Sequence, residues 1–263
     1  MAEYKKLKCY FDKELAKLLA GKIEQVYPEF QSKKFVKKIA DSVDDVELKA
    51  RVEIITDALH DYLPADYKKA VKILLQILGP ENENETGMFK EGYWLMPVAF
   101  FVEKYGCDDF KPSINAIYEI TKRHTGEYAV RPFLDKYPRK MISTMKDWSQ
   151  DKSFHVRRLA SEGVRPRLPW AKKMERFIND PTPILQILEN LKEDDSLFVR
   201  KSVANNLNDI LKDNYKIAMR VLKKWSKSKS SETNWIIKHT LRKEIKKDNP
   251  EALQLVDKLE RSN

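Results

Sequence analysis

Two acidic side chains in the second half of the chain have the chemistry of a catalytic pair. Glu162 lies in the run Val156-Arg-Arg-Leu-Ala-Ser-Glu-Gly163, and Asp209 ends a polar helical stripe made of Ser202, Asn205, Asn206 and Asp209. The opposite stripe is apolar and is expected to face the core; it consists of Val199, Val203, Leu207 and Ile210. Carboxylates can stabilise a positively charged transition state and orient a water molecule. We expect Glu162 and Asp209 to project from adjacent helices, with backbones about 10 Å apart, onto one concave surface.

Simpler interpretations of these two acids stay open. Glu162 follows Arg158 by four residues, which is the spacing of an ordinary ion pair within a helix. Asp209 can equally be a polar residue in the last turn of its helix. Two acids in a basic region would repel a phosphate backbone, so their presence there needs a reason.

A short proline-rich segment follows Glu162. In Arg165-Pro-Arg-Leu-Pro-Trp170, two prolines exclude a helix interior and predict a rigid loop. Such a loop can present Arg165 and Arg167 to phosphates and the Trp170 indole to a base or sugar. The alternative is that Trp170 closes the core beneath the loop. Three other tryptophans on apolar stripes are predicted to be core residues, namely Trp148, Trp225 and Trp235.

Several other chemistries are excluded by residue type and spacing. The four histidines, His60, His124, His155 and His239, are scattered and have no second ligand at metal spacing, so we expect no metal. No nucleophile elbow, phosphate loop or dinucleotide fingerprint is present, and we expect no cofactor. Two cysteines do not make a disulfide framework. The absence of a long apolar run and of a signal peptide predicts a soluble, cytoplasmic protein that does not bind a membrane.

Positive charge is concentrated in the second half of the chain. The 263 residues carry a net charge of +10. Residues 131–176 have a net charge of +8 and residues 211–247 a net charge of +9, so the remainder is acidic. This distribution is typical of a protein that binds a polyanion, although a merely solubilising lysine-rich surface gives the same total.

The elements that must position these residues all have helical periodicity. Seven glycines in 263 residues are few for a sheet-rich fold. Apolar residues recur with a 3.6-residue period, and the sequence predicts helices over 46–62, 66–78, 95–105 and 114–123, and another that opens at Thr125-Gly126.

An internal repeat organises the basic half. Asp151-Lys-Ser-Phe-His-Val-Arg-Arg158 recurs 43 residues later as Asp194-Asp-Ser-Leu-Phe-Val-Arg-Lys201, with a weaker third copy at Glu232 to His239. Helix pairs with this period predict an all-α fold, an α-α superhelix of HEAT-like repeats, forming a single domain over 1–263 with a concave basic groove. The DNA-binding residues predicted for that groove are Arg157, Arg158, Arg165, Arg167, Arg200, Lys201, Lys238 and Arg242.

The runs Val156 to Trp170 and Asp195 to Asp209 resemble the AlkC branch of the HEAT-repeat DNA alkylation repair glycosylases. The resemblance covers about residues 126–252. It implies excision of cationic alkylated bases of the 3-methyladenine type from double-stranded DNA, without metal or cofactor and without full base flipping. It also implies that Glu162, Asp209 and Trp170 occupy active-site positions and that Arg158 and Arg165 lie beside the lesion. Glu127, which by spacing alone would pair with Arg131, matches a further acidic position.

The resemblance does not decide the domain content, the oligomeric state or the catalytic activity of this chain. Some larger members add a C-terminal immunoglobulin-like domain, which we expect this chain to lack because it ends at Asn263. A groove of this kind needs one chain, so we expect a monomer. The main alternative is a non-catalytic member of the superfamily that binds branched or distorted DNA. A protein-interaction solenoid would instead have an apolar concave face.

Overall fold

The structure, a computed structural model, describes residues 5–86 and 92–261, and every regular element assigned within them is helical. This confirms the all-α prediction. The chain divides into two compact units, Met1–Lys136 and Tyr137–Asn263. The prediction of a single domain over 1–263 stays a prediction. No helix in the described part of the chain is long and apolar enough to cross a membrane.

Unit 1 holds η1 (Leu7–Tyr10), α1 (Lys13–Val26), α2 (Ser32–Ala40), α3 (Leu48–Tyr62), α4 (Tyr67–Gln76), η2 (Tyr93–Leu95), α5 (Met96–Tyr105), α6 (Phe110–Thr121) and α7 (Val130–Lys136). The helices predicted from periodicity over 46–62, 66–78, 95–105 and 114–123 correspond to α3, α4, α5 and α6. The helix predicted to open at Thr125-Gly126 begins later, at Val130.

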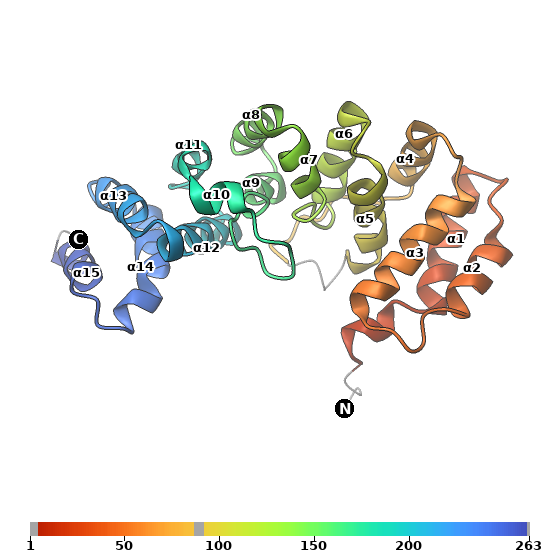
Figure 1. The fold of residues 1–263 in the computed structure, drawn as a ribbon, viewed down its shortest axis with the longest axis horizontal. Coiled ribbons are helices and arrows are strands. Elements are labelled where there is room, and N and C mark those ends of the chain that lie inside the picture. Colours follow the sequence, from red (N-terminus) through yellow and green to blue (C-terminus); the bar gives the residue numbers. More distant parts are fainter. Residues whose placement is uncertain (1–4, 87–91, 262–263) are drawn as a thin grey trace. The chain divides into compact units, whose positions relative to one another are not determined.

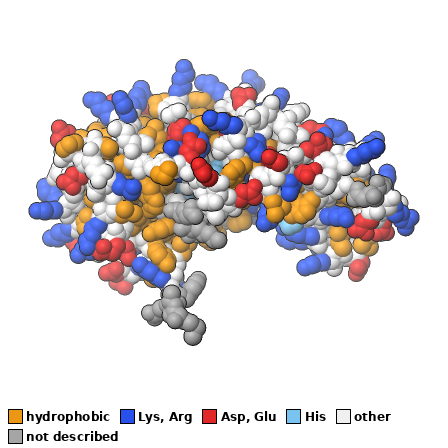
Figure 2. Space-filling view, turned by 180° about the vertical axis from the view of Figure 1, so that it is seen from behind, with side chains coloured by type: hydrophobic (Ala, Val, Ile, Leu, Met, Phe, Trp, Pro, Cys, Tyr) orange, Lys and Arg blue, Asp and Glu red, His pale blue; other side chains and the backbone are white. Residues whose placement is uncertain are grey.

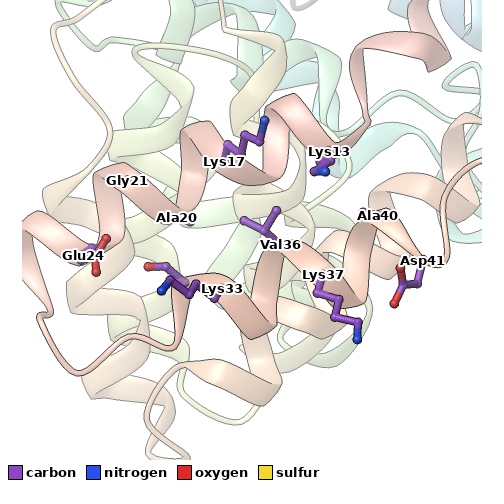
Figure 3. Close-up of a pocket in the computed structure, with 11 residues that line it drawn as sticks. Lys13, Lys17, Ala20, Gly21, Glu24, Lys33, Val36, Lys37, Ala40 and Asp41 are labelled. Atoms are coloured by element: carbon purple, nitrogen blue, oxygen red, sulfur yellow. The ribbon is translucent and has the colours of Figure 1, made fainter.

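A hollow of about 530 Å³ lies between α1 and α2 and is lined by Lys13, Lys17, Lys33 and Lys37 among others (Figure 3). None of the predicted site residues lines this hollow, so the candidate site lies elsewhere.

Unit 2 holds α8 (Pro138–Trp148), α9 (Phe154–Glu162), α10 (Glu175–Asn179), α11 (Thr182–Asn190), α12 (Leu197–Asp213), α13 (Tyr215–Trp225), α14 (Ser231–Ile245) and α15 (Pro250–Arg261). Helices α9, α12 and α14 pack side by side in chain order, and α8, α11 and α13 cover them in a second row (Figure 1). The predicted core stripe of α12 is fully buried between the rows. This two-row arrangement explains why each repeat is a helix pair.

A two-residue capping turn sets the register of the three repeats. Ser153, Ser196 and Ser230 are the N-cap residues of α9, α12 and α14. The backbone N–H of each donates to a side chain two residues earlier, on Asp151 (2.8 Å), Asp194 (2.9 Å) and Ser228 (3.1 Å) respectively. The third repeat therefore begins at Ser228 and not at Glu232, so the alignment predicted for the third copy is wrong by one helical turn.

Hydrogen bonds between the helices support this register. Asn206 on α12 donates to the Ser161 carbonyl on α9 at 2.7 Å, and Thr240 on α14 donates to the Ala204 carbonyl on α12 at 3.4 Å. These donors and acceptors are equivalent once the N-cap serines are aligned. In this alignment Trp235 corresponds to Arg158, and His239 corresponds to Glu162 and Asn205.

Packing on α12 gives a direct test of the buried stripe. Replacing Leu207 by Ala should lower the free energy of unfolding by about 2–5 kcal/mol, because the side chain is fully buried and its removal leaves a cavity. The matched change Leu197→Ala, on the same helix but 37% exposed, should change it by only about 0.5 kcal/mol. Denaturant titration of both variants checks this, and equal effects would contradict the assignment of the core face.

Candidate active site

The structure brings Glu162 and Asp209 together on a single guanidinium group. Glu162 is the last residue of α9 and Asp209 lies in the last turns of α12, and these helices are in contact. Arg165, three residues beyond Glu162, donates from Nη1 to Glu162 Oε1 at 2.7 Å and from Nε to Asp209 Oδ2 at 2.9 Å. The carboxylates thus share one cation. Arg165, predicted as a DNA-binding residue, links the two predicted catalytic acids.

Each carboxylate has a second polar partner. Ser202 Oγ on α12 donates to Glu162 Oε2 at 2.6 Å. Lys212 Nζ lies 2.8 Å from Asp209 Oδ1. The ion pair that the sequence left open for Glu162 is present as well, with Arg158 Nη2 at 3.7 Å from Oε1. Both acids therefore lie in a charge network that spans α9 and α12.

Burial and charge act in opposite directions on Glu162. Burial would raise the pKa of its carboxyl group, but the nearby Arg158 and Arg165 guanidinium groups, with the Ser202 hydrogen bond, lower the pKa below its usual value overall. Burial would lower the pKa of the Arg165 guanidinium, but the adjacent Glu162 and Asp209 carboxylates raise it overall. Glu162 is consequently held as an anion at neutral pH without a proton to donate.

The polar stripe of α12 is less accessible than the sequence predicted. Ser202, Asn206 and Asp209 are buried, and Glu162 is only 5% exposed, because α9 packs directly against this side of α12. The expectation that both acids project openly onto a surface needs this correction. Asn205, half-buried on the same helix, accepts a hydrogen bond from Arg242 of α14 at 2.9 Å.

Trp170 stands out among the large apolar side chains. It is 57% exposed, so the interpretation that it closes the core is wrong. Its φ of +65° lies in the left-handed region, which a residue with a side chain adopts at a cost of about 1–2 kcal/mol. The loop is closed by a hydrogen bond from the Met174 N–H to the Pro166 carbonyl at 2.9 Å. A strained backbone therefore presents an indole ring a few residues from the Glu162–Arg165 pair.

Two of the predicted DNA-binding arginines hold the repeat turns together. Arg157 Nη1 donates to the Asp151 carbonyl at 3.0 Å, and its guanidinium also contacts Asp194 of the next repeat. Arg200, the equivalent residue of α12, donates to the Asp194 carbonyl at 2.8 Å. The hydrogen bond to Asp194 is the main cause that raises the pKa of Arg157. Their assignment to DNA stays a prediction, and their contacts are structural.

The other predicted basic residues differ in how they are engaged. Arg167 makes a two-point contact with Asp213, at 2.6 and 2.7 Å. Lys238 pairs with Glu260 at 2.9 Å, whereas Lys201 is exposed. On the face drawn in Figure 2, Lys and Arg side chains stand at many separate points with acidic side chains among them. Positive charge on that face is distributed and does not form one patch.

Glu127 lies in unit 1, where it is buried and accepts a hydrogen bond from Thr125 Oγ1 at 3.0 Å. The catalytic role of Glu127 stays a prediction.

The sequence did not indicate two further residues. One is Glu103 of α5: burial raises the pKa of its carboxyl group to about 7, although Arg131 and Lys49 oppose the shift. The other is Ser202 as a partner of Glu162. Only the repeat register could have indicated that contact, because 40 residues separate the two.

The charged network contains no arrangement suited to a metal. Among residues 5–86 and 92–261, no group of three or more His, Cys, Asp or Glu side chains lies close enough together to hold one. Glu162 and Asp209 meet a guanidinium group instead. What this arrangement offers chemically is a pair of carboxylates whose positions are fixed by Arg165.

Comparisons with known proteins agree with the sequence and the fold. Residues 124–243 match the model of a family described as DNA alkylation repair enzyme. The chain is 40% identical over 250 residues to the uncharacterized protein YhaZ of Bacillus subtilis (strain 168), covering 95% of this chain and 67% of YhaZ. It also matches the alkylpurine DNA glycosylase AlkC of Pseudomonas fluorescens, solved bound to DNA containing an abasic site analogue. That match has a TM-score of 0.87 and 36% identity, and covers 96% of this chain and 68% of AlkC.

Proposed function

This chain belongs to the DNA alkylation repair enzyme family, and we propose that it is a DNA glycosylase that excises cationic alkylated bases of the 3-methyladenine type. The observation that supports this most is the pair of buried carboxylates joined by Arg165, with the exposed Trp170 on the loop that follows. Glu162 and Asp209 are the residues to which we assign catalysis.

The chemistry of the lesion explains why acids would be placed among cations. A base alkylated at N3 or N7 is positively charged, so it leaves as a neutral molecule and needs no proton from the enzyme. The sugar left behind develops positive charge as the bond breaks. Glu162, held ionised, and Asp209 would stabilise that charge and orient the attacking water, with their geometry fixed in advance by Arg165.

DNA binding would also change the balance within the network. The Lys212 side chain, which pairs with Asp209, is 44% exposed on a flexible stem. A DNA phosphate is a competing partner for this ammonium group. Once it turns to the phosphate, Asp209 keeps the buried Arg165 contact and presents more of its negative charge to the sugar.

Trp170 is assigned to packing on the damaged nucleotide. Replacing it by Gly should weaken binding of alkylated duplex by about 1–3 kcal/mol through loss of stacking. The free energy of unfolding should change by no more than about 1 kcal/mol, because glycine accepts a positive φ without strain. Fluorescence anisotropy and denaturant titration measure the two quantities. Trp170→Phe keeps an aromatic ring and should retain most of the affinity. A Trp170→Gly variant that is destabilised but still binds alkylated duplex normally would contradict this role.

The test of the proposed function is chemical identification of a released base. The protein is incubated with duplex DNA treated with a methylating agent, and the small molecules are separated by chromatography. Release of 3-methyladenine is expected. DNA that is bound but loses no base would contradict the glycosylase assignment.

A non-catalytic role in binding branched or distorted DNA is the second candidate. It is favoured by the complete pairing of Glu162 and Asp209 with cations, which a purely structural network would also show. Tight binding of a four-way junction together with no base release would support it.

A further inference from the structure

One side of α14 carries an aromatic and basic cluster at the positions that hold the acid site in the first repeat. When the N-cap serines are aligned, Trp235, His239 and Arg242 are equivalent to Arg158, Glu162 and Arg165. The cluster therefore continues the row of side chains on which the candidate active site lies, two helices further along the same unit. A histidine stands where the first repeat has its buried carboxylate.

The geometry of the cluster is well defined. The His239 ring is stacked on the Trp235 indole, with centroids 4.6 Å apart and an interplanar angle of 11°. The Arg200 guanidinium of α12 also lies over the Trp235 indole, 5.9 Å from its ring centre. Arg242 is anchored to the Asn205 side chain at 2.9 Å and to the His239 carbonyl. The imidazole is thus held in place while both rings remain half-buried, so the prediction that Trp235 is a core residue is wrong.

The charges around His239 are cationic. Burial lowers the pKa of its imidazole, and Arg242 on its own helix and Lys201 on α12 lower it further. From the remaining helices that pack on α14, Glu260 of α15 is paired with Lys238, and Lys223 of α13 is paired with Glu251. Among the described residues no carboxylate forms an ion pair with Lys201 or Arg242; Asp209 of α12 acts on Arg242 at longer range, and Arg165 opposes it. The arrangement is suited to an anion that compensates these charges.

We propose that Trp235, His239 and Arg242 form a contact for the DNA backbone on α14, at which protonation of His239 strengthens binding to a phosphate. This rests on the proposed function only in taking DNA as the ligand. Arg242 and Lys201 supply permanent charge, Trp235 holds the imidazole in place by stacking, and His239 supplies a charge that depends on pH.

The sign of the pH effect follows from the free protein. His239 is neutral at pH 7 because its pKa lies below the ordinary value of 6.5, and a bound phosphate favours the protonated form. DNA binding is therefore coupled to proton uptake, and affinity should rise as the pH falls below 7. One further phosphate neutralised makes the slope of log affinity against log salt steeper by about 0.9.

The experiment measures affinity for an undamaged duplex at pH 8 and pH 5.5 over a series of salt concentrations. The wild type should bind more tightly at pH 5.5, with a slope steeper by about 0.9. His239→Asn should show the same slope at both pH values, and His239→Lys should have the steeper slope at both. His60→Asn is the matched control, because His60 of α3 is also stacked on an aromatic ring, that of Tyr105 at 4.0 Å. It should behave as the wild type, and Glu103, which titrates near pH 7, is unchanged in every variant.

The outcomes separate this contact from the proposed function. If His239→Asn keeps the pH dependence of the wild type, or the wild type has none, the contact is refuted; thermal melting verifies that each variant is folded. Base release from methylated DNA is measured on the same preparations. A wild type that releases base without the pH-dependent slope overturns only the His239 contact. A wild type that shows the slope but releases no base overturns only the glycosylase assignment.

Discussion

Replacing Asp209 by Asn, or Glu162 by Gln, is expected to slow the release of alkylated base by about 100-fold or more, the usual effect of removing one preorganised electrostatic group. Each change keeps the size of the side chain, removes its charge and replaces one hydrogen-bond-accepting oxygen by a donating NH₂ group. The transition state loses stabilisation, whereas the ground-state complex, in which the sugar is neutral, loses little. Single-turnover chromatography of released base, together with affinity for undamaged duplex, measures the effect.

A control carboxylate in the same unit defines the comparison. Glu244 of α14 pairs with Lys247 at 2.8 Å, and Glu244→Gln should leave base release at the wild-type rate. If Asp209→Asn and Glu162→Gln both retain the full rate with DNA binding unchanged, the catalytic assignment is wrong. Loss of base release in proportion to loss of DNA affinity would instead indicate a binding role.

The second large effect concerns stability. Replacing Arg165 by Met should lower the free energy of unfolding at pH 7 by about 3–5 kcal/mol, because it leaves two buried carboxylates without their shared cation. The matched change Arg167→Met removes an arginine from the same loop, but its pair with Asp213 is exposed to water and screened. That variant should unfold close to the wild type in denaturant titration.

The pH dependence of this difference tests its cause. The pKa of Glu162 is lowered in the folded protein, so its ionisation stabilises the fold above its ordinary pKa, and this contribution is lost as the pH falls through the folded value. In Arg165→Met the Glu162 carboxyl can take up a proton, and this removes the free-energy cost of a buried charge that has lost its cation. The stability deficit should therefore shrink between pH 7 and pH 4. A deficit that is constant over this range would point to lost packing of the arginine side chain.

Local patterns in the sequence predicted most of the fold, because they are short-range properties. The 3.6-residue period located α3, α4, α5 and α6 of unit 1 and the buried stripe of α12. The prolines around Arg167 correctly predicted a loop, but they did not decide between the exposed and the buried position of Trp170, which is 57% exposed. Side-chain similarity at Glu232 to His239 predicts a start of the third repeat that is one helical turn too late, because the capping turn at Ser228 and Ser230 fixes where α14 begins.

The candidate site was predicted less completely, because its contacts join distant segments. Spacing suggested the Glu162–Arg158 pair, which is present at 3.7 Å, but not the shorter Arg165 contact that also reaches Asp209. A side chain as long as arginine can turn toward solvent or toward a neighbouring helix, and its sequence position does not decide between them. The same holds for Arg157, expected at DNA and found on the turn at Asp194.

The central claim is that Glu162 and Asp209 stabilise a positively charged sugar. Its most direct test compares the affinity of the protein for two duplexes, one with a neutral tetrahydrofuran at the abasic position and one with a cationic pyrrolidine of the same shape. The wild type should bind the cationic duplex more tightly, and this preference should disappear in Asp209→Asn and Glu162→Gln. Equal affinity of the wild type for both duplexes, or a preference that survives both substitutions, would contradict the claim.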